Sequence, residues 1–143
     1  MIIFFINLLV SILLGAMIFF MAVVSPSVFA TLSSNASSKF LRTIFPRMFL
    51  FGFIIAVLSL IFSFISSNIL NCILLIIVAI SFIINRNYLT PKINHYRDKE
   101  LDGDINASAS FKKLHLLSVL LFVLNFALIL FIIVINYYTN TYQ

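Results

Sequence analysis

The sequence predicts an all-α integral membrane protein, a four-helix bundle with both termini outside the cytoplasm. Apolar residues make up 63% of the 143 residues, charged residues only 9%, and the mean hydropathy is +1.20. A soluble domain carries about 25% charged residues, so this chain could not cover a water-facing surface. Four apolar runs have about the length that crosses a bilayer. We therefore expect one transmembrane domain over residues 1–143 and no soluble domain.

The four spans are expected at residues 2–24, 45–65, 69–84 and 114–138. The first lacks the basic start of a signal peptide and is apolar for longer, so it is predicted to be retained. At 1.5 Å per residue it reaches about 34 Å, enough for a hydrocarbon core of about 30 Å. The third is short, so either the residues from Arg86 to Leu89 snorkel to complete it or the bilayer thins around it.

The charges give the predicted orientation. All nine Lys and Arg residues lie between Lys39 and Lys113. Polar loops are expected at residues 25–44 and 85–113, and these loops with the adjoining helix starts hold every basic residue. Lys and Arg beside spans are kept on the cytoplasmic side, so both loops are predicted to be cytoplasmic, at the inner membrane if the host is a bacterium. Orientation and anionic headgroups explain the net charge of +5, so no nucleic-acid partner is expected.

Each span carries a stripe of small or polar residues, expected to face the bundle interior because polar groups facing lipid are costly. Asn7 and Ser11 mark this face in the first span, and Ser118 and Asn125 mark it in the fourth. The other stripe residues are Gly15, Ala22, Gly52, Ala56, Ser59, Ser63, Ser66, Ser81 and Asn85. Two interpretations stay open, since such stripes either pack helices together or line a path for a small molecule. In the second interpretation Asn7, Ser11, Ser118 and Asn125 form the lining, and His115 is a gate at the cytoplasmic end.

His115 follows a pair of lysines at the start of the fourth span. It is expected either to fix the loop at residues 85–113 or to handle a ligand or proton, because imidazole titrates near neutral pH.

The sequence carries no recognisable catalytic motif: it has no Gly-rich phosphate loop, nucleophile elbow or zinc-type cluster. We therefore expect no enzyme, no resident cofactor and no metal. Haem is disfavoured because the second histidine, His95, lies in a polar loop. Copper handling over Met17 and Met21, with Met48 or Cys72 as soft ligands, stays an alternative, although Met at helical spacing is more often core filler.

Three prolines punctuate the helices. Pro26 follows the first span and Pro91 follows the third, and each is expected to kink or end its helix and turn the chain along the interface. Pro46 is expected in the first turn of the second span, where proline is tolerated.

The segment from Asn85 to Pro91 and the pattern Phe111-x-x-Leu114-His115-x-x-Ser118 resemble the transmembrane protein 205-like family, a four-helix membrane domain with no established activity. The resemblance spans nearly the whole chain and implies four helices, but it supplies no substrate. The motif positions it implies are Pro26, Asn85, Pro91, Phe111, His115, Ser118 and Asn125. A four-helix family related to anthrone oxygenases is a second candidate, but it requires a Trp-rich fourth helix, and the chain has no Trp.

These observations predict a small multi-pass membrane protein that acts as a structural or transport-associated module without turnover. Membrane-embedded redox or copper handling is the alternative function. The expected partners are the lipid bilayer and either a second copy of the chain or another membrane protein.

Overall fold

The structure, a computed structural model, describes the backbone of residues 1–141 and the side chains of residues 1–139. Within this part the chain forms helices and turns. The helical elements are α1 (Ile2–Phe19), the π-helical turn η1 (Phe20–Val24), α2 (Ser25–Thr31), α3 (Ser34–Ile65), α4 (Ile69–Ile84), the π-helical turn η2 (Asn85–Leu89), α5 (Thr90–Leu101) and α6 (Ile105–Thr141).

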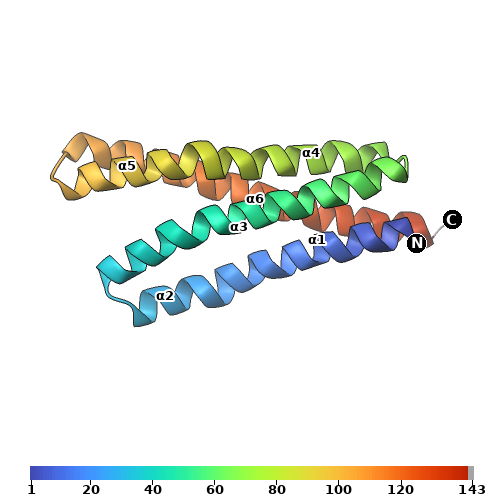
Figure 1. Ribbon diagram of the computed structural model, residues 1–143, viewed down its shortest axis with the longest axis horizontal. Coiled ribbons are helices and arrows are strands. Elements are labelled where there is room, and N and C mark those ends of the chain that lie inside the picture. The colour runs from blue at the N-terminus through green and yellow to red at the C-terminus, as the bar shows by residue number, and fades with distance from the viewer. Residues whose placement is uncertain (142–143) are drawn as a thin grey trace.

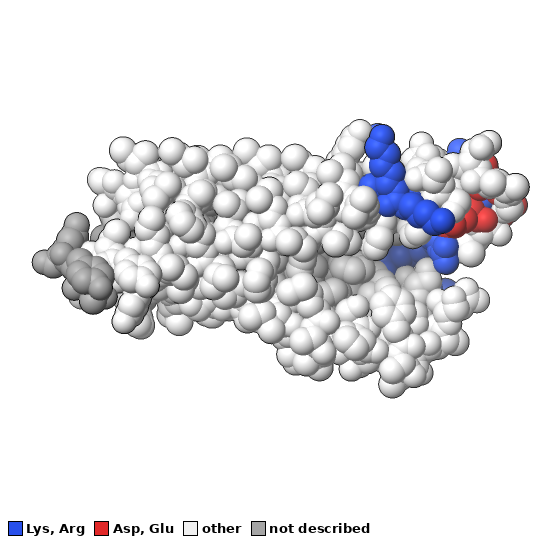
Figure 2. Space-filling view, turned by 180° about the vertical axis from the view of Figure 1, so that it is seen from behind, with Lys and Arg blue, Asp and Glu red and all other residues white. Residues whose placement is uncertain are grey.

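These elements join into four continuous helical rods that are long and apolar enough to cross a membrane. The rods run side by side as a bundle, which confirms the predicted all-α fold (Figure 1). The N-terminus and the α3–α4 turn lie at one end, here called the terminal end. The α2–α3 and α5–α6 turns lie at the other, here called the charged end, because every Lys, Arg, Asp and Glu belongs to the segments gathered there (Figure 2).

The loops predicted at residues 25–44 and 85–113 are wrong as loops, because helices run through nearly all of both. Only residues 32–33 and 102–104 interrupt the helices there. In the interruption at residues 102–104, Gly103 has a φ of +97°. The Asp104 carboxylate caps α6 by accepting a hydrogen bond from the backbone N–H of Asn106 at 2.9 Å. Hydropathy reports where the bilayer ends, whereas a helix continues through polar residues until a turn sequence stops it.

The prolines stand inside helical rods, so the prediction that the chain turns away at Pro26 and Pro91 is wrong. Pro26 lies just beyond η1, and Pro91 lies just beyond η2. Proline has no N–H and crowds the carbonyl four residues earlier, and the wider π-helical turn accommodates that mismatch without ending the rod. Pro46 lies well inside α3 instead of in its first turn, because that helix already begins at Ser34.

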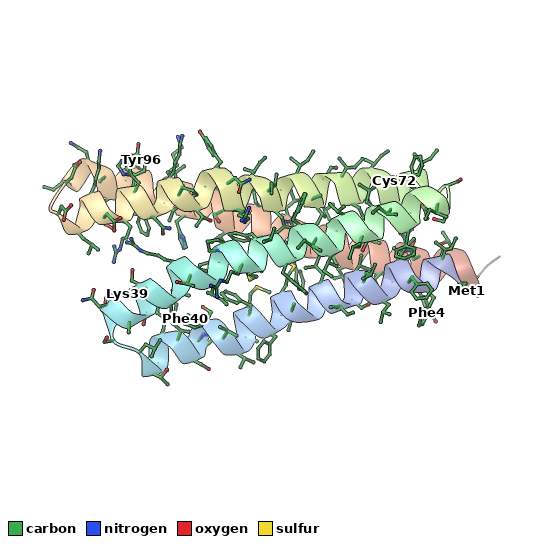
Figure 3. The ribbon with its side chains drawn as sticks, viewed as in Figure 1. Met1, Phe4, Lys39, Phe40, Cys72 and Tyr96 are labelled. Atoms are coloured by element: carbon green, nitrogen blue, oxygen red, sulfur yellow. The ribbon has the colours of Figure 1, made fainter. Side chains whose placement is uncertain are left out.

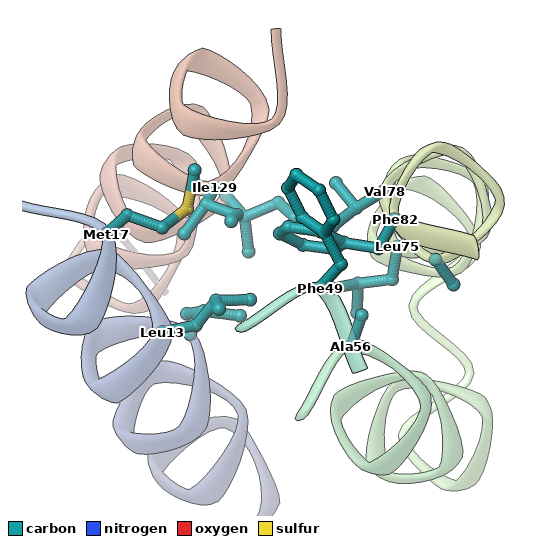
Figure 4. Close-up of a cluster of buried hydrophobic side chains, with 11 residues drawn as sticks. Leu13, Met17, Phe49, Ala56, Leu75, Val78, Phe82 and Ile129 are labelled. Atoms are coloured by element: carbon teal, nitrogen blue, oxygen red, sulfur yellow. The ribbon is translucent and has the colours of Figure 1, made fainter. Parts of the chain in front are cut away.

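The core lies midway along the bundle and draws on all four rods (Figure 4). Its buried members are Val10, Leu13, Met17, Phe49, Ala56, Leu75, Val78, Ala79, Phe82, Ile129 and Ile132. The small residues of α3 face this core as predicted, with Gly52, Ser59 and Ser63 buried. At Gly52 the Phe82 ring packs so closely that a Cβ would lie 2.7–2.8 Å from three ring atoms.

The small-residue stripe of α1 does not face the core, so the prediction for Ser11 and Gly15 is wrong. Both are exposed on the outer face of α1. The buried residues of α1 are instead Ile6, Val10, Leu13 and Met17. On α1 the van der Waals contact with the other rods is therefore made by these larger side chains.

Candidate functional site

A groove of about 860 Å³ opens where the α2–α3 hairpin diverges from the α5–α6 hairpin at the charged end. In the space-filling view the molecule is hollowed between these two lobes (Figure 2). Ligand pockets commonly enclose about 300–1,000 Å³, so the groove is large enough for a small molecule.

The lining of the groove is divided between apolar and polar groups. Arg42 and Arg97 lie nearer the ends of the two hairpins, whereas Phe45, Phe49 and Phe122 lie further toward the middle of the bundle. The aromatic side chains pack together, with ring centroids 5.9 Å apart between Phe45 and Phe49. The groove is therefore amphipathic: its outer end combines the two arginines with apolar side chains, and its interior is aromatic.

An ion pair bridges the two walls of the groove. The Arg42 guanidinium on α3 donates to both carboxylate oxygens of Asp98 on α5, at 3.1 and 2.5 Å. This hydrogen-bonded pairing lowers the pKa of Asp98 below its ordinary value of 3.8. The pair acts as a latch between the hairpins, in a part of the chain that projects beyond the apolar spans.

The second arginine of the groove belongs to a network on the α5–α6 wall. Arg97 pairs with Glu100 and stands 5.3 Å from the centroid of the Phe111 ring. The Ser108 hydroxyl donates to Glu100 at 2.7 Å, and this bond, followed by the one from Arg97, lowers the pKa of Glu100. The acidic residues here are thus held ionised, and the nine basic residues of the charged end exceed the four acidic ones, which favours anions.

Several predicted site residues meet on this same wall. Phe111, His115 and Ser118 line the groove, and the His115 ring stacks on Phe111 with centroids 5.8 Å apart. The Ser118 hydroxyl donates to Asn85 Oδ1 at 2.6 Å, and the Thr90 hydroxyl donates to the Asn85 carbonyl at 2.7 Å. Asn85 therefore ties η2 to the groove-facing side of α6.

Pro26 and Pro91 lie in the helical rods outside the groove lining. Both are exposed, and neither lines the groove. Each stands beside a groove residue, since Ser25 and Thr90 belong to the lining.

The structure does not gather the predicted polar lining into one cavity. Asn7 lies toward the terminal end, where Asn136 donates to it at 2.8 Å and Asn71 donates to Asn136 at 2.9 Å. Ser11 is exposed. Asn125 is fully buried, away from the groove lining. The Asn7–Asn71–Asn136 cluster crosses three helices. Sequence analysis missed Asn71 and Asn136, although each of these two lies seven residues from another buried residue of its own helix.

The alternative copper ligands are spread along the bundle. Met17 is buried in the core and Met48 packs against that core, Met21 is exposed on the groove rim, and Cys72 lies near the terminal end (Figure 3). His95 is exposed and packs edge-on against Tyr96. Among the described residues no group of three or more His, Cys, Asp or Glu is placed to hold a metal ion.

The model of a family described as a domain of unknown function, DUF4149, matches residues 8–101. The matched region includes Pro26, Asn85 and Pro91 and ends before the groove residues of α6. No curated protein and no solved structure matches the chain.

Proposed function

The chain belongs to the DUF4149 family, and we propose that its four-helix membrane domain binds an amphipathic molecule with an anionic head in the groove between the α2–α3 and α5–α6 hairpins. The observation that carries this proposal is the divided lining, with two arginines toward the outer end and phenylalanines further in. In this role the protein is a structural or transport-associated module and performs no chemical turnover.

The head of the ligand is assigned to the arginines. A guanidinium binds carboxylate and phosphate through two parallel hydrogen bonds. Arg42 already holds the Asp98 carboxylate in this way, so a ligand head of the same geometry could replace Asp98. Arg97 is stacked beside Phe111 and positioned to share the charge.

The tail of the ligand is assigned to the aromatic interior and the open side of the groove. Met21 and Phe29 on one rim and Val119 and Val123 on the other are exposed apolar side chains. Exposed apolar residues on a membrane helix face lipid, so an acyl chain could enter sideways from the bilayer and lie against Phe122.

Two further arguments support this function. The transmembrane protein 205-like resemblance marks Asn85, Phe111, His115 and Ser118, which meet on the α5–α6 wall. The clustering of basic residues at the charged end supports a cytoplasmic groove with both termini outside. The redox or copper alternative has less support, because Cys72 lies near the terminal end, far along the bundle from Met21 on the groove rim.

Native mass spectrometry of the purified protein, released from detergent micelles, tests the proposal. Dodecyl phosphate and dodecyltrimethylammonium are added at equal concentrations as anionic and cationic probes of equal chain length. We expect one dodecyl phosphate per chain at saturation and little binding of the cationic probe. Equal occupancy by the two probes would contradict an anion-selective groove.

The matched variants are Arg97→Gln and Lys99→Gln, since both change a basic residue of α5 and only Arg97 lines the groove. Losing a charge-assisted hydrogen-bond donor costs about 1.5–3 kcal/mol, so Arg97→Gln should weaken dodecyl phosphate binding at least about tenfold. Lys99→Gln should change it less than about twofold. Equal effects of the two variants, in proteins with the same helical circular dichroism, would remove the groove from the explanation.

A further inference from the structure

Three buried side chains of α4, η2 and α6 carry polar atoms that have no hydrogen-bond partner among the described residues. Asn125 is 0% exposed, and neither its Nδ2 nor its Oδ1 has a partner among the described residues. Asn85 Nδ2 and Ser81 Oγ also have no partner among the described residues, and their side chains are 0% and 4% exposed. A buried polar group without a partner is costly, more so at the depth of a membrane. From this we infer that water is bound between these helices, behind the groove, at Asn125, Ser81 and Asn85.

The helix register brings the three residues to neighbouring levels. The Ser118–Asn85 hydrogen bond fixes one level of the antiparallel rods. From there Asn125 is two turns further along α6, about 10.5 Å, and Ser81 is one turn back along α4, about 6 Å. Both steps lead away from the charged end, so Asn125 and Ser81 differ in level by about 4–5 Å. One or two water molecules span such a separation.

The donors and acceptors favour water over a cation. The two amide NH₂ groups need acceptors, while Ser81 Oγ and Asn125 Oδ1 need donors. A water molecule supplies both, and buried waters make two to four such bonds. A cation would face unpaired N–H groups, and the nearest carboxylates are at the charged end, on residues 98–104. The occupant is therefore neutral.

Hydrogen bonds link the site to the groove on one side, and apolar residues close it on the other. Ser118 and Thr90 line the groove and both bond to Asn85, so only this layer of side chains separates the site from the groove. Toward the terminal end Leu75, Ile129 and Ile132 are 0% exposed and separate it from the asparagine cluster there. The structure thus assigns a blind, hydrated pocket that reaches into the membrane-spanning core. It stands independently of any ligand in the groove.

Cysteine accessibility tests the inference in a Cys72→Ser background. Asn125→Cys is compared with Ile132→Cys, because both positions are on the same face of α6, are 0% exposed, and lie one heptad apart. The probe is the small water-borne reagent 2-aminoethyl methanethiosulfonate. We expect Asn125→Cys to react at least about tenfold faster than Ile132→Cys. Equal rates would overturn the hydrated pocket.

Thermal unfolding of Asn125→Leu gives a second readout if the cysteine variant folds poorly. In a dry site, removing an unpaired amide would raise the melting temperature. In a hydrated site, the change removes two partners from the bound water and leaves Ser81 and Asn85 less well satisfied. We therefore expect a lower melting temperature than for the unaltered chain, and an equal or higher value would contradict the inference.

Discussion

The close packing of Phe82 on the backbone of α3 gives the sharpest test of the bundle. Gly52→Ala places a methyl group 2.7 Å from Cζ and 2.8 Å from Cε1 and Cε2 of the Phe82 ring. The ring is 1% exposed and lies 6.4 Å from the Phe49 ring, centroid to centroid. It cannot move without disturbing other core residues.

The expected cost follows from a comparison with Gly15→Ala. At Gly15 nothing lies within 4 Å of the added Cβ. Both changes gain helix propensity, by about 0.5–1 kcal/mol, and this gain cancels in the difference between them. What remains is overpacking at Gly52, about 1–3 kcal/mol. Gly52→Ala should therefore be less stable than Gly15→Ala by that amount.

The assay is unfolding in mixed micelles with increasing sodium dodecyl sulfate, followed by circular dichroism. A double-mutant cycle with Phe82→Leu assigns the cost, because a smaller side chain should relieve most of the clash. A difference between the two alanine variants below about 0.5 kcal/mol would refute the packing argument. So would an unchanged penalty in the Phe82→Leu background, since the strain would then lie elsewhere.

Three other outcomes are expected. Asn136→Leu should destabilise the bundle by about 0.6–2 kcal/mol in the same unfolding assay, because interhelical hydrogen bonds are lost. Ser11→Leu, on the lipid-facing side, should change stability by less than about 0.5 kcal/mol. The Arg42–Asp98 latch should hold at and above the ordinary carboxyl pKa of 3.8 and be lost as the pH falls through the lower folded pKa, because Arg42 stabilises the ionised carboxylate. Double electron–electron resonance between labelled hairpins should show separation only in that acidic range, and in Asp98→Asn at every pH. A reporter active only outside the cytoplasm should work after the last residue and be silent near Gly103, and the reverse result would overturn the predicted orientation.

Much of the architecture could be predicted from composition and spacing. The apolar runs predicted four spans, and the structure contains four rods of sufficient length and apolar character. The inward faces of α3 and α4 followed from small and polar residues at helical spacing, including Gly52 and Ser81. The same rule failed on α1, where Leu13 and Met17 are buried and Ser11 is exposed, because the face that a helix buries depends on the neighbours it packs against.

The candidate site could be predicted only in part. The sequence pattern that includes Phe111, His115 and Ser118 corresponds to one wall of the groove. The opposite wall could not be found in the same way, because Arg42 resembles any basic residue beside a span. Its pairing with Asp98 crosses from α3 to α5 and has no local signal in the sequence.

The sequence by itself determined that this protein belongs in a lipid bilayer, how many spans it has and at which end its charges gather. Burial in lipid requires long apolar helices, whatever helices they pack against. Only the tertiary structure decided that the helices continue past the apolar runs and diverge into a groove. It also decided which asparagines meet and that Asn125 stands without a protein partner among the described residues. These features depend on how helices distant in the sequence align and pack, and each helix's own residues specify its length and apolar faces but not its register against the others.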